Sequence, residues 1–87
     1  MTIYRVVLER RAENALDALD RQTRLRISNA LSRLAENPLT APNVKALAHG
    51  GFRLRVGDYR ILYNIDDEVL VILVVKVGHR RDVYRNR

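Results

Sequence analysis

The 87-residue sequence contains no cysteine and no tryptophan, and only 6% of its residues are aromatic. Without cysteine the chain can form neither a disulfide framework nor a thiolate metal site. Its longest apolar run, VLVILVV at 69–75, is far too short to span a bilayer and is typical of a buried strand. The amino-terminal residues also lack the long apolar stretch of a signal peptide. We therefore expect a cytoplasmic protein that is not inserted in a membrane.

A chain of this length predicts a single small domain over residues 1–87. The apolar fraction of 47% and the charged fraction of 30% are those of a folded globular protein. The net charge of +6 is large for the size, and it indicates an anionic partner such as nucleic acid or an acidic protein. The excess lies late in the chain, since residues 44–63 and 76–87 carry +3 and +4 around an acidic block.

Hydrophobic periodicity predicts the element order β-α-α-β-β-β. Apolar residues recur at helical spacing in two segments that form a helix hairpin, and Pro38 stops the second helix. Residues 37–51 read as a connecting loop because they hold two prolines and two glycines. The acidic residues Asp66, Asp67 and Glu68 read as a polar turn between the last two strands. The predicted strands are 3–8, 52–56, 59–65 and 68–77, and the predicted helices are 10–20 and 24–38.

The segment FRLRVGDYR at 52–60 predicts a β-hairpin closed by a Gly-Asp turn, with Gly57 supplying a positive φ. If Val56 faces Tyr59, then Arg55 faces Arg60, and Arg53 lies on the same side of the sheet. The apolar residues alternate with these arginines, so we expect them to pack against the helix hairpin as the core: Phe52, Leu54, Val56, Tyr59, Ile61 and Tyr63.

Opposed arginines destabilise a sheet by about 0.2 to 1 kcal/mol, so the cluster needs an explanation. One reading is that these are solvated side chains on the exposed face of a two-layer fold. The other is an anion site, because arginine offers planar bidentate donors to phosphate. The tail KVGHRRDVYRNR at 76–87 favours the second reading, since a short helical turn after Gly78 would place Arg80 or Arg81 one turn before Tyr84. Cations beside an aromatic ring are typical of RNA recognition.

The hairpin LRVGDYRILYNI, followed by a strand and by VGHRRDVYRNR, resembles the RelE/ParE superfamily of bacterial toxins. The similarity covers nearly the whole chain and includes the first helix, LERRAENALDALD. It implies a two-layer α+β fold, with a helix hairpin packed on one face of a mainly antiparallel sheet. In the RelE branch it implies a ribosome-dependent endoribonuclease that cleaves mRNA in the A site and uses no metal or other cofactor.

By position, the resemblance makes Arg60 the transition-state arginine, Arg80 the leaving-group acid, and Tyr84 the base or base-stacking residue. Arg53 and Arg55 stand where the best-known member has lysines. Because arginine keeps its proton at any workable pH, neither can act as a general base, and both are expected to hold phosphate. The base is then Tyr84, His79 or a group of ribosomal RNA. Further candidates for the site or for phosphate binding are Lys45, Lys76, Arg81 and Arg85.

Three classes of function follow. The first is the mRNA endoribonuclease, the second a ParE-like inhibitor of DNA gyrase without catalysis, and the third a non-catalytic basic binding module. The resemblance also implies a cognate antitoxin that forms a hetero-oligomer with the toxin and brings it to operator DNA. An acidic, partly disordered antitoxin would complement the basic surface. In the first class the 70S ribosome and mRNA are further partners.

Overall fold

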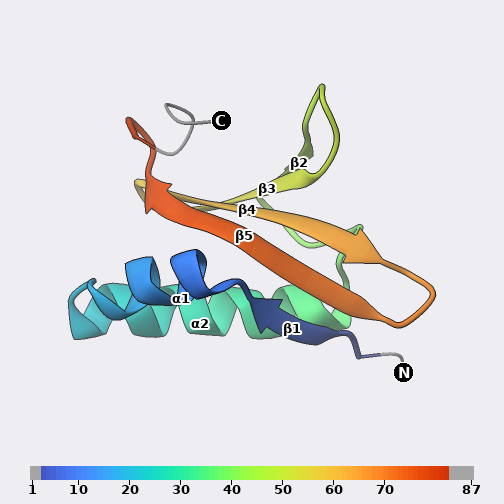
Figure 1. The fold of residues 1–87 in the computed structure, drawn as a ribbon, viewed down its shortest axis with the longest axis horizontal. Coiled ribbons are helices and arrows are strands. Elements are labelled where there is room, and N and C mark those ends of the chain that lie inside the picture. The colour runs from blue at the N-terminus through green and yellow to red at the C-terminus, as the bar shows by residue number, and fades with distance from the viewer. Residues whose placement is uncertain (1–2, 83–87) are drawn as a thin grey trace.

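The computed structural model describes residues 3–82, which form two layers. Two helices lie side by side against one face of a five-stranded sheet (Figure 1). This confirms the predicted α+β architecture. The elements in chain order are β1 (Arg5–Leu8), α1 (Arg10–Asp17), α2 (Arg21–Glu36), β2 (Val44–Ala46), β3 (Phe52–Val56), β4 (Tyr59–Asp66) and β5 (Val71–His79).

The strand order in the sheet is β1-β5-β4-β3-β2. β1 runs parallel to β5, and the other neighbours are antiparallel, so the sheet is mainly antiparallel as expected. The structure corrects the predicted order at one point, because β2 forms a fifth strand inside residues 37–51, which were expected to be a loop. Only three residues long, β2 is too short for its alternation to be recognised in the sequence.

The β3–β4 hairpin has the predicted register. Val56 pairs with Tyr59 and Arg55 with Arg60, and Gly57 has a φ of 58° at the first turn position. Alternate residues therefore point to opposite faces. Leu54, Ile61 and Tyr63 are buried on the helix side, which confirms the predicted core face.

The core lies between the helices and this face of the sheet. Its largest fully buried side chains come from α2, β4 and β5: Ile27, Leu34, Ile61, Tyr63, Ile72 and Val74. The ring of Tyr63 stacks on Phe52 with centroids 5.6 Å apart. Burial raises the pKa of Tyr63 to about 12, and its hydroxyl has no hydrogen-bond partner among the described residues.

The second helix begins three residues earlier than predicted, at Arg21, because Asp20 caps it. The Asp20 carboxylate accepts hydrogen bonds from the Thr23 hydroxyl at 2.6 Å and from the Thr23 N–H at 3.1 Å. These bonds lower the pKa of Asp20. The helix ends at Glu36, two residues before Pro38, as the proline requires. None of the helices described within residues 3–82 is long and apolar enough to cross a membrane.

The last strand is displaced from its predicted range. Residues 68–70 form a turn instead, because Asp66 Oδ1 accepts the backbone N–H groups of Glu68 and Val69. At its other end β5 continues through Gly78 to His79, so the expectation that Gly78 ends the strand is wrong. β4 is long enough to pair with both residues. Residues 80–82 form a turn; the predicted helical turn toward Tyr84 extends outside the described residues.

Replacing Tyr63 by Phe tests the cost of the buried hydroxyl. Because Tyr63 Oη has no partner among the described residues, its removal loses no hydrogen bond there. We expect the free energy of unfolding in urea to stay equal or rise by about 1 kcal/mol near pH 7. A clear fall in that free energy would contradict the placement of the hydroxyl.

The same variant should also change how the free energy of unfolding depends on pH in the alkaline range. Burial raises the pKa of Tyr63 from the ordinary 10.0 of a tyrosine to about 12 in the folded protein. The unfolded chain ionises this phenol near pH 10, whereas the folded protein keeps it protonated to about pH 12, so the free energy of unfolding falls as the pH rises from about 10 to about 12. Urea unfolding across this range should show a smaller loss of stability for Tyr63→Phe than for wild type, and equal losses would refute the assignment.

Candidate active site on the basic face of the sheet

Five basic side chains form two neighbouring rows on the sheet face opposite the helices, and we call these two rows the basic face: Lys45, Arg53, Arg55, Arg60 and Lys76. Strand register places them in two rows, because directly opposed residues share a face. One row runs Lys45, Arg53, Leu62, Lys76 across β2 to β5. The next row runs Arg55, Arg60, Gly78. The register of the sheet therefore assembles cations from four strands on one side.

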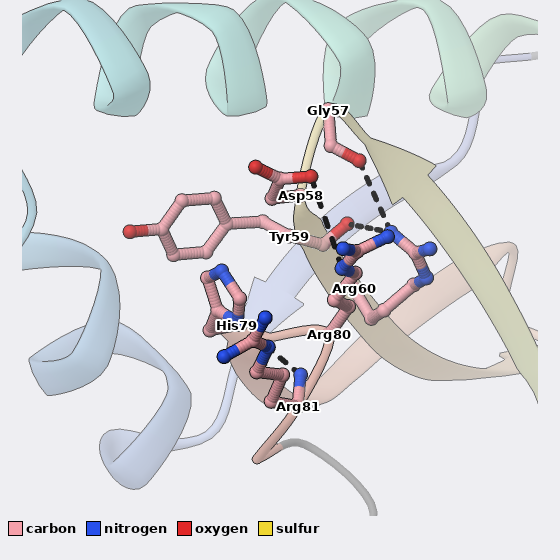
Figure 2. Close-up of polar contacts among 7 residues, drawn as sticks. All are labelled: Gly57, Asp58, Tyr59, Arg60, His79, Arg80 and Arg81. Atoms are coloured by element: carbon pink, nitrogen blue, oxygen red, sulfur yellow. Dashed lines mark hydrogen bonds and ion pairs between the residues drawn. The ribbon is translucent and has the colours of Figure 1, made fainter.

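Arg60 is held in place by its own hairpin. Its Nη1 atom donates hydrogen bonds to the carbonyl oxygens of Gly57 and Tyr59, each at 3.1 Å (Figure 2). The side chain is half-buried. Gly78 stands opposite it on β5 and contributes no side chain to the row. Two carbonyls thus fix one edge of the guanidinium, and its other N–H groups are left to bind an anion.

Arg55 and Arg53 flank this position on β3. The Nη2 atom of Arg55 donates to Asn43 Oδ1 at 3.3 Å, and the backbone of Asn43 has a left-handed φ of 67°. Arg53 is half-buried, and its Nε has no hydrogen-bond partner among the described residues. A buried donor without a partner costs stability unless a ligand or water satisfies it.

The residues after β5 place further cations at the hairpin tip. The backbone N–H of Arg80 donates to the carbonyl of Asp58 at 2.7 Å. Its Nε lies 4.0 Å from Asp58 Oδ1, and both side chains are exposed (Figure 2). Arg81 is exposed and donates its backbone N–H to His79 Nδ1 at 3.2 Å. A backbone contact therefore brings Arg80 to the turn that also anchors Arg60.

His79 lies on the other side of the sheet. It pairs with Tyr59, and the two rings meet edge to face with centroids 5.8 Å apart. Figure 2 shows both rings extending away from the Arg60 side chain. Since His79 Nδ1 accepts a backbone N–H, the proton of the neutral ring resides on Nε2. The structure thus does not bring His79 together with the basic face. Tyr84 and Arg85 lie outside the described residues.

This arrangement can bind and neutralise phosphate. Arg53, Arg55 and Arg60 retain their protons at any physiological pH, and no described carboxylate forms an ion pair with them. Neither a carboxylate nor a histidine occupies the two described rows of the basic face. The face can therefore stabilise developing negative charge but holds no conventional general base within residues 3–82.

Sequence reasoning missed two residues that shape this region. Asn43 accepts a hydrogen bond from Arg55 and lies in a segment that was expected to be a loop. The only sequence feature that indicates its role is that asparagine tolerates the left-handed backbone conformation found there. Arg26 of α2 lies against Gly57, where an added Cβ would come within 3.2 Å of Nη2. Helical spacing assigns Arg26 only to a solvated surface, so its contact with the hairpin turn could not be anticipated.

Comparisons with known proteins agree with this fold. The family model described as ParE toxin of type II toxin-antitoxin system, parDE, matches residues 6–84. Toxin RelG of Mycobacterium tuberculosis is 43% identical over 58 residues, which make up 64% of this chain and 66% of RelG. The match therefore spans just under two thirds of that relative.

Solved toxin-antitoxin complexes share the architecture. The match to the RelBE2 complex of Mycobacterium tuberculosis has a TM-score of 0.78 and 31% identity, covering 91% of this chain and all of the matched one. The match to the archaeal RelE-RelB complex of Pyrococcus horikoshii has a TM-score of 0.82 and 25% identity, over 94% of this chain and all of the other.

The helix hairpin, the five-stranded sheet and these similarities define a toxin of the RelE/ParE superfamily. The chain belongs to the ParE toxin family of type II toxin-antitoxin systems.

The opposed pair Arg55 and Arg60 should reduce stability in the absence of a ligand. We expect Arg55→Thr to raise the free energy of unfolding by about 0.2 to 1 kcal/mol at low salt, because it removes repulsion between directly opposed cations. The gain should shrink in about 1 M KCl, where the Debye length is about 3 Å. Urea unfolding at both salt concentrations measures the effect.

Arg5→Thr is the matched control for this prediction. Arg5 is an exposed strand arginine that pairs with Val71, so its replacement relieves no opposed charge. If both variants change stability equally at each salt concentration, the repulsion between Arg55 and Arg60 is not the cause.

Proposed function

We propose that this toxin is a metal-independent endoribonuclease that cleaves mRNA in the ribosomal A site and so stops translation in the cytoplasm. The observation that carries the proposal is the basic face, where Arg60 is fixed by two carbonyls among four further cations. Such a surface suits a phosphate that gains charge during reaction. Relatives named RelG and RelE support the same activity class.

The reaction is an internal transesterification. The ribose 2′-oxygen loses its proton and bonds to the adjacent phosphorus, while the bond from phosphorus to the 5′-oxygen breaks. The products are a 2′,3′-cyclic phosphate and a 5′-hydroxyl. Arg60 neutralises the charge that develops on the phosphorane, and Arg53, Arg55, Lys45 and Lys76 hold the flanking phosphates. The leaving 5′-oxygen takes up a proton from solvent while Arg80 or Arg81 stabilises its negative charge, and Arg85 adds to phosphate binding.

Deprotonation of the 2′-hydroxyl explains why the ribosome would be needed. The described rows of the basic face hold only apolar residues, glycine and cations, and arginine cannot serve as a base. The base is then Tyr84 or a group of ribosomal RNA. If ribosomal RNA supplies it, the toxin alone cannot complete the reaction, and free mRNA would remain intact.

A cognate antitoxin is the second partner. The solved complexes that this chain resembles pair a RelE-type toxin with a RelB-type antitoxin. With a net charge of +6, the toxin favours an acidic antitoxin that covers part of the basic surface. We propose that operator DNA is contacted through the antitoxin.

A gyrase inhibitor is the alternative, and the match to the ParE family model favours it. That function needs binding without catalysis. It therefore predicts inhibition of DNA supercoiling and no cleavage of mRNA on ribosomes. We rank the endoribonuclease first because Arg60 is fixed among cations that form no ion pair with a carboxylate of residues 3–82, and such an arrangement suits a charged transition state.

Arg60→Ala should abolish cleavage. Loss of one preorganised donor to a charged transition state lowers the rate by about 100- to 1000-fold. The measurement is primer extension on a defined mRNA in cell-free translation, with and without ribosomes. Wild-type protein should give ribosome-dependent cuts, and Arg60→Ala should give none at the same concentration.

The matched control is Arg5→Ala, which removes an exposed strand arginine on the edge strand β1, outside the two rows of the basic face. It should cleave as wild type does. Binding of the antitoxin to Arg60→Ala should stay within about fivefold of wild type, because one solvent-accessible ionic contact contributes at most about 1 kcal/mol. If mRNA stays intact at toxic concentrations and DNA supercoiling is inhibited, the toxin is a gyrase inhibitor and the endoribonuclease proposal is wrong.

A further inference from the structure

A second cluster of arginines lines a pocket that adjoins the basic face at Arg55. The pocket lies between α2, residues 41–43 and the end of β3, and its volume is about 280 Å³. Three arginines and two asparagines line it: Arg26, Arg33, Arg55, Asn29 and Asn43. Neither the predicted site nor the proposed chemistry uses Arg26 or Arg33.

The spacing of α2 builds one wall of this pocket. Arg26 and Arg33 are seven residues apart, so they lie on the same side of the helix about 10 Å apart along its axis. Ala30 stands between them, and its small side chain leaves space above Leu54 and Val56, which also line the pocket. This wall of the pocket therefore consists of the side chains of Arg26 and Arg33, with open space over Ala30 between them.

Within residues 3–82 the pocket carries positive charge without a counter-ion. None of its lining residues is acidic, and no described carboxylate forms an ion pair with Arg26, Arg33 or Arg55. Residues 21–57 contain seven Arg or Lys residues and one acid, Glu36. Cations placed together without carboxylates repel each other, and an anionic ligand would relieve that repulsion.

Two contacts position these cations at the hairpin. The Arg26 guanidinium lies against Gly57, close enough that a Cβ there would be 3.2 Å from Nη2. Arg55 is directed to Asn43 Oδ1 at the pocket wall, while strand register sets it directly opposite Arg60. Arg55 therefore connects the pocket to the basic face around the tip of the β3–β4 hairpin.

We propose that this pocket is a second phosphate-binding site, which holds the backbone of RNA while the basic face holds the scissile phosphate. The inference rests on the proposed function for the identity of the ligand as RNA. A chain with a charge at every nucleotide matches a line of arginines that runs from α2 to β4, and guanidinium and amide groups are the usual ligands of phosphate and ribose. The pocket supplies affinity and takes no part in bond breaking.

The test compares two double variants of equal charge. Arg26→Gln with Arg33→Gln removes the pocket cations. Arg21→Gln with Arg24→Gln removes two arginines of the same helix that do not line this pocket. The probe is the 70S ribosome programmed with a short mRNA, titrated with fluorescently labelled toxin at several KCl concentrations. Circular dichroism first verifies that each variant is folded.

We expect the pocket variant to bind the programmed ribosome about tenfold or more weakly, since it loses charge-assisted hydrogen bonds to phosphate. The slope of log affinity against log salt should become shallower by about 0.7 for one lost phosphate contact. The control variant should stay within about threefold of wild type, because exposed charges act weakly through screened solvent.

A rate measurement separates this inference from the proposed function. At saturating toxin the pocket variant should cleave mRNA at the wild-type rate, whereas Arg60→Ala binds the ribosome and does not cleave. Equal affinity and salt slope for the two double variants would overturn the inference and leave the endoribonuclease standing. Retained ribosome binding with lost antitoxin binding would make the pocket a protein interface instead. If wild-type toxin has no affinity for ribosomes, both proposals fail.

Discussion

The β3–β4 hairpin is the constraint on which the rest of the molecule depends. Its two-residue turn requires the left-handed φ of 58° at Gly57, and that turn sets the register in which Arg55 faces Arg60 and Leu54 faces Ile61. A slip of one residue would exchange the two faces, burying arginines under the helices and exposing the core. The same register fixes where β2 and β5 add their own cations.

The two faces of the sheet have different roles: the face against the helices stabilises the fold, and the basic face carries the proposed function. The helix side is stabilised by burial of Ile27, Ile61 and Ile72. The basic face gathers like charges, which oppose folding and become favourable only when an anion binds. Arg60 shows how the structure limits that cost, since two carbonyls of its own hairpin hold the guanidinium. A site prepared in this way loses little side-chain freedom when phosphate arrives.

Local sequence patterns predicted the hairpin well, because strict alternation and a Gly-Asp turn leave a single register. They failed where contacts between segments far apart in the sequence determine whether a strand forms and where it ends. β2 forms only because β3 offers an edge to Val44–Ala46, and β5 extends to His79 because β4 is long enough to pair with it. His79 falls on the helix side for the same reason. The pocket of Arg26, Arg33 and Arg55 could not be predicted, since its parts come from three separated segments.

The chemical identity of the cleaved ends tests the central claim most directly. A short mRNA bound in the A site of programmed 70S ribosomes is incubated with wild-type toxin, and the fragments are analysed by mass spectrometry. Attack by the 2′-hydroxyl on a phosphate held by the basic face predicts an upstream fragment that ends in a 2′,3′-cyclic phosphate and a downstream fragment that begins with a 5′-hydroxyl. Fragments with a 3′-hydroxyl and a 5′-phosphate, or no fragments at all, would contradict the account.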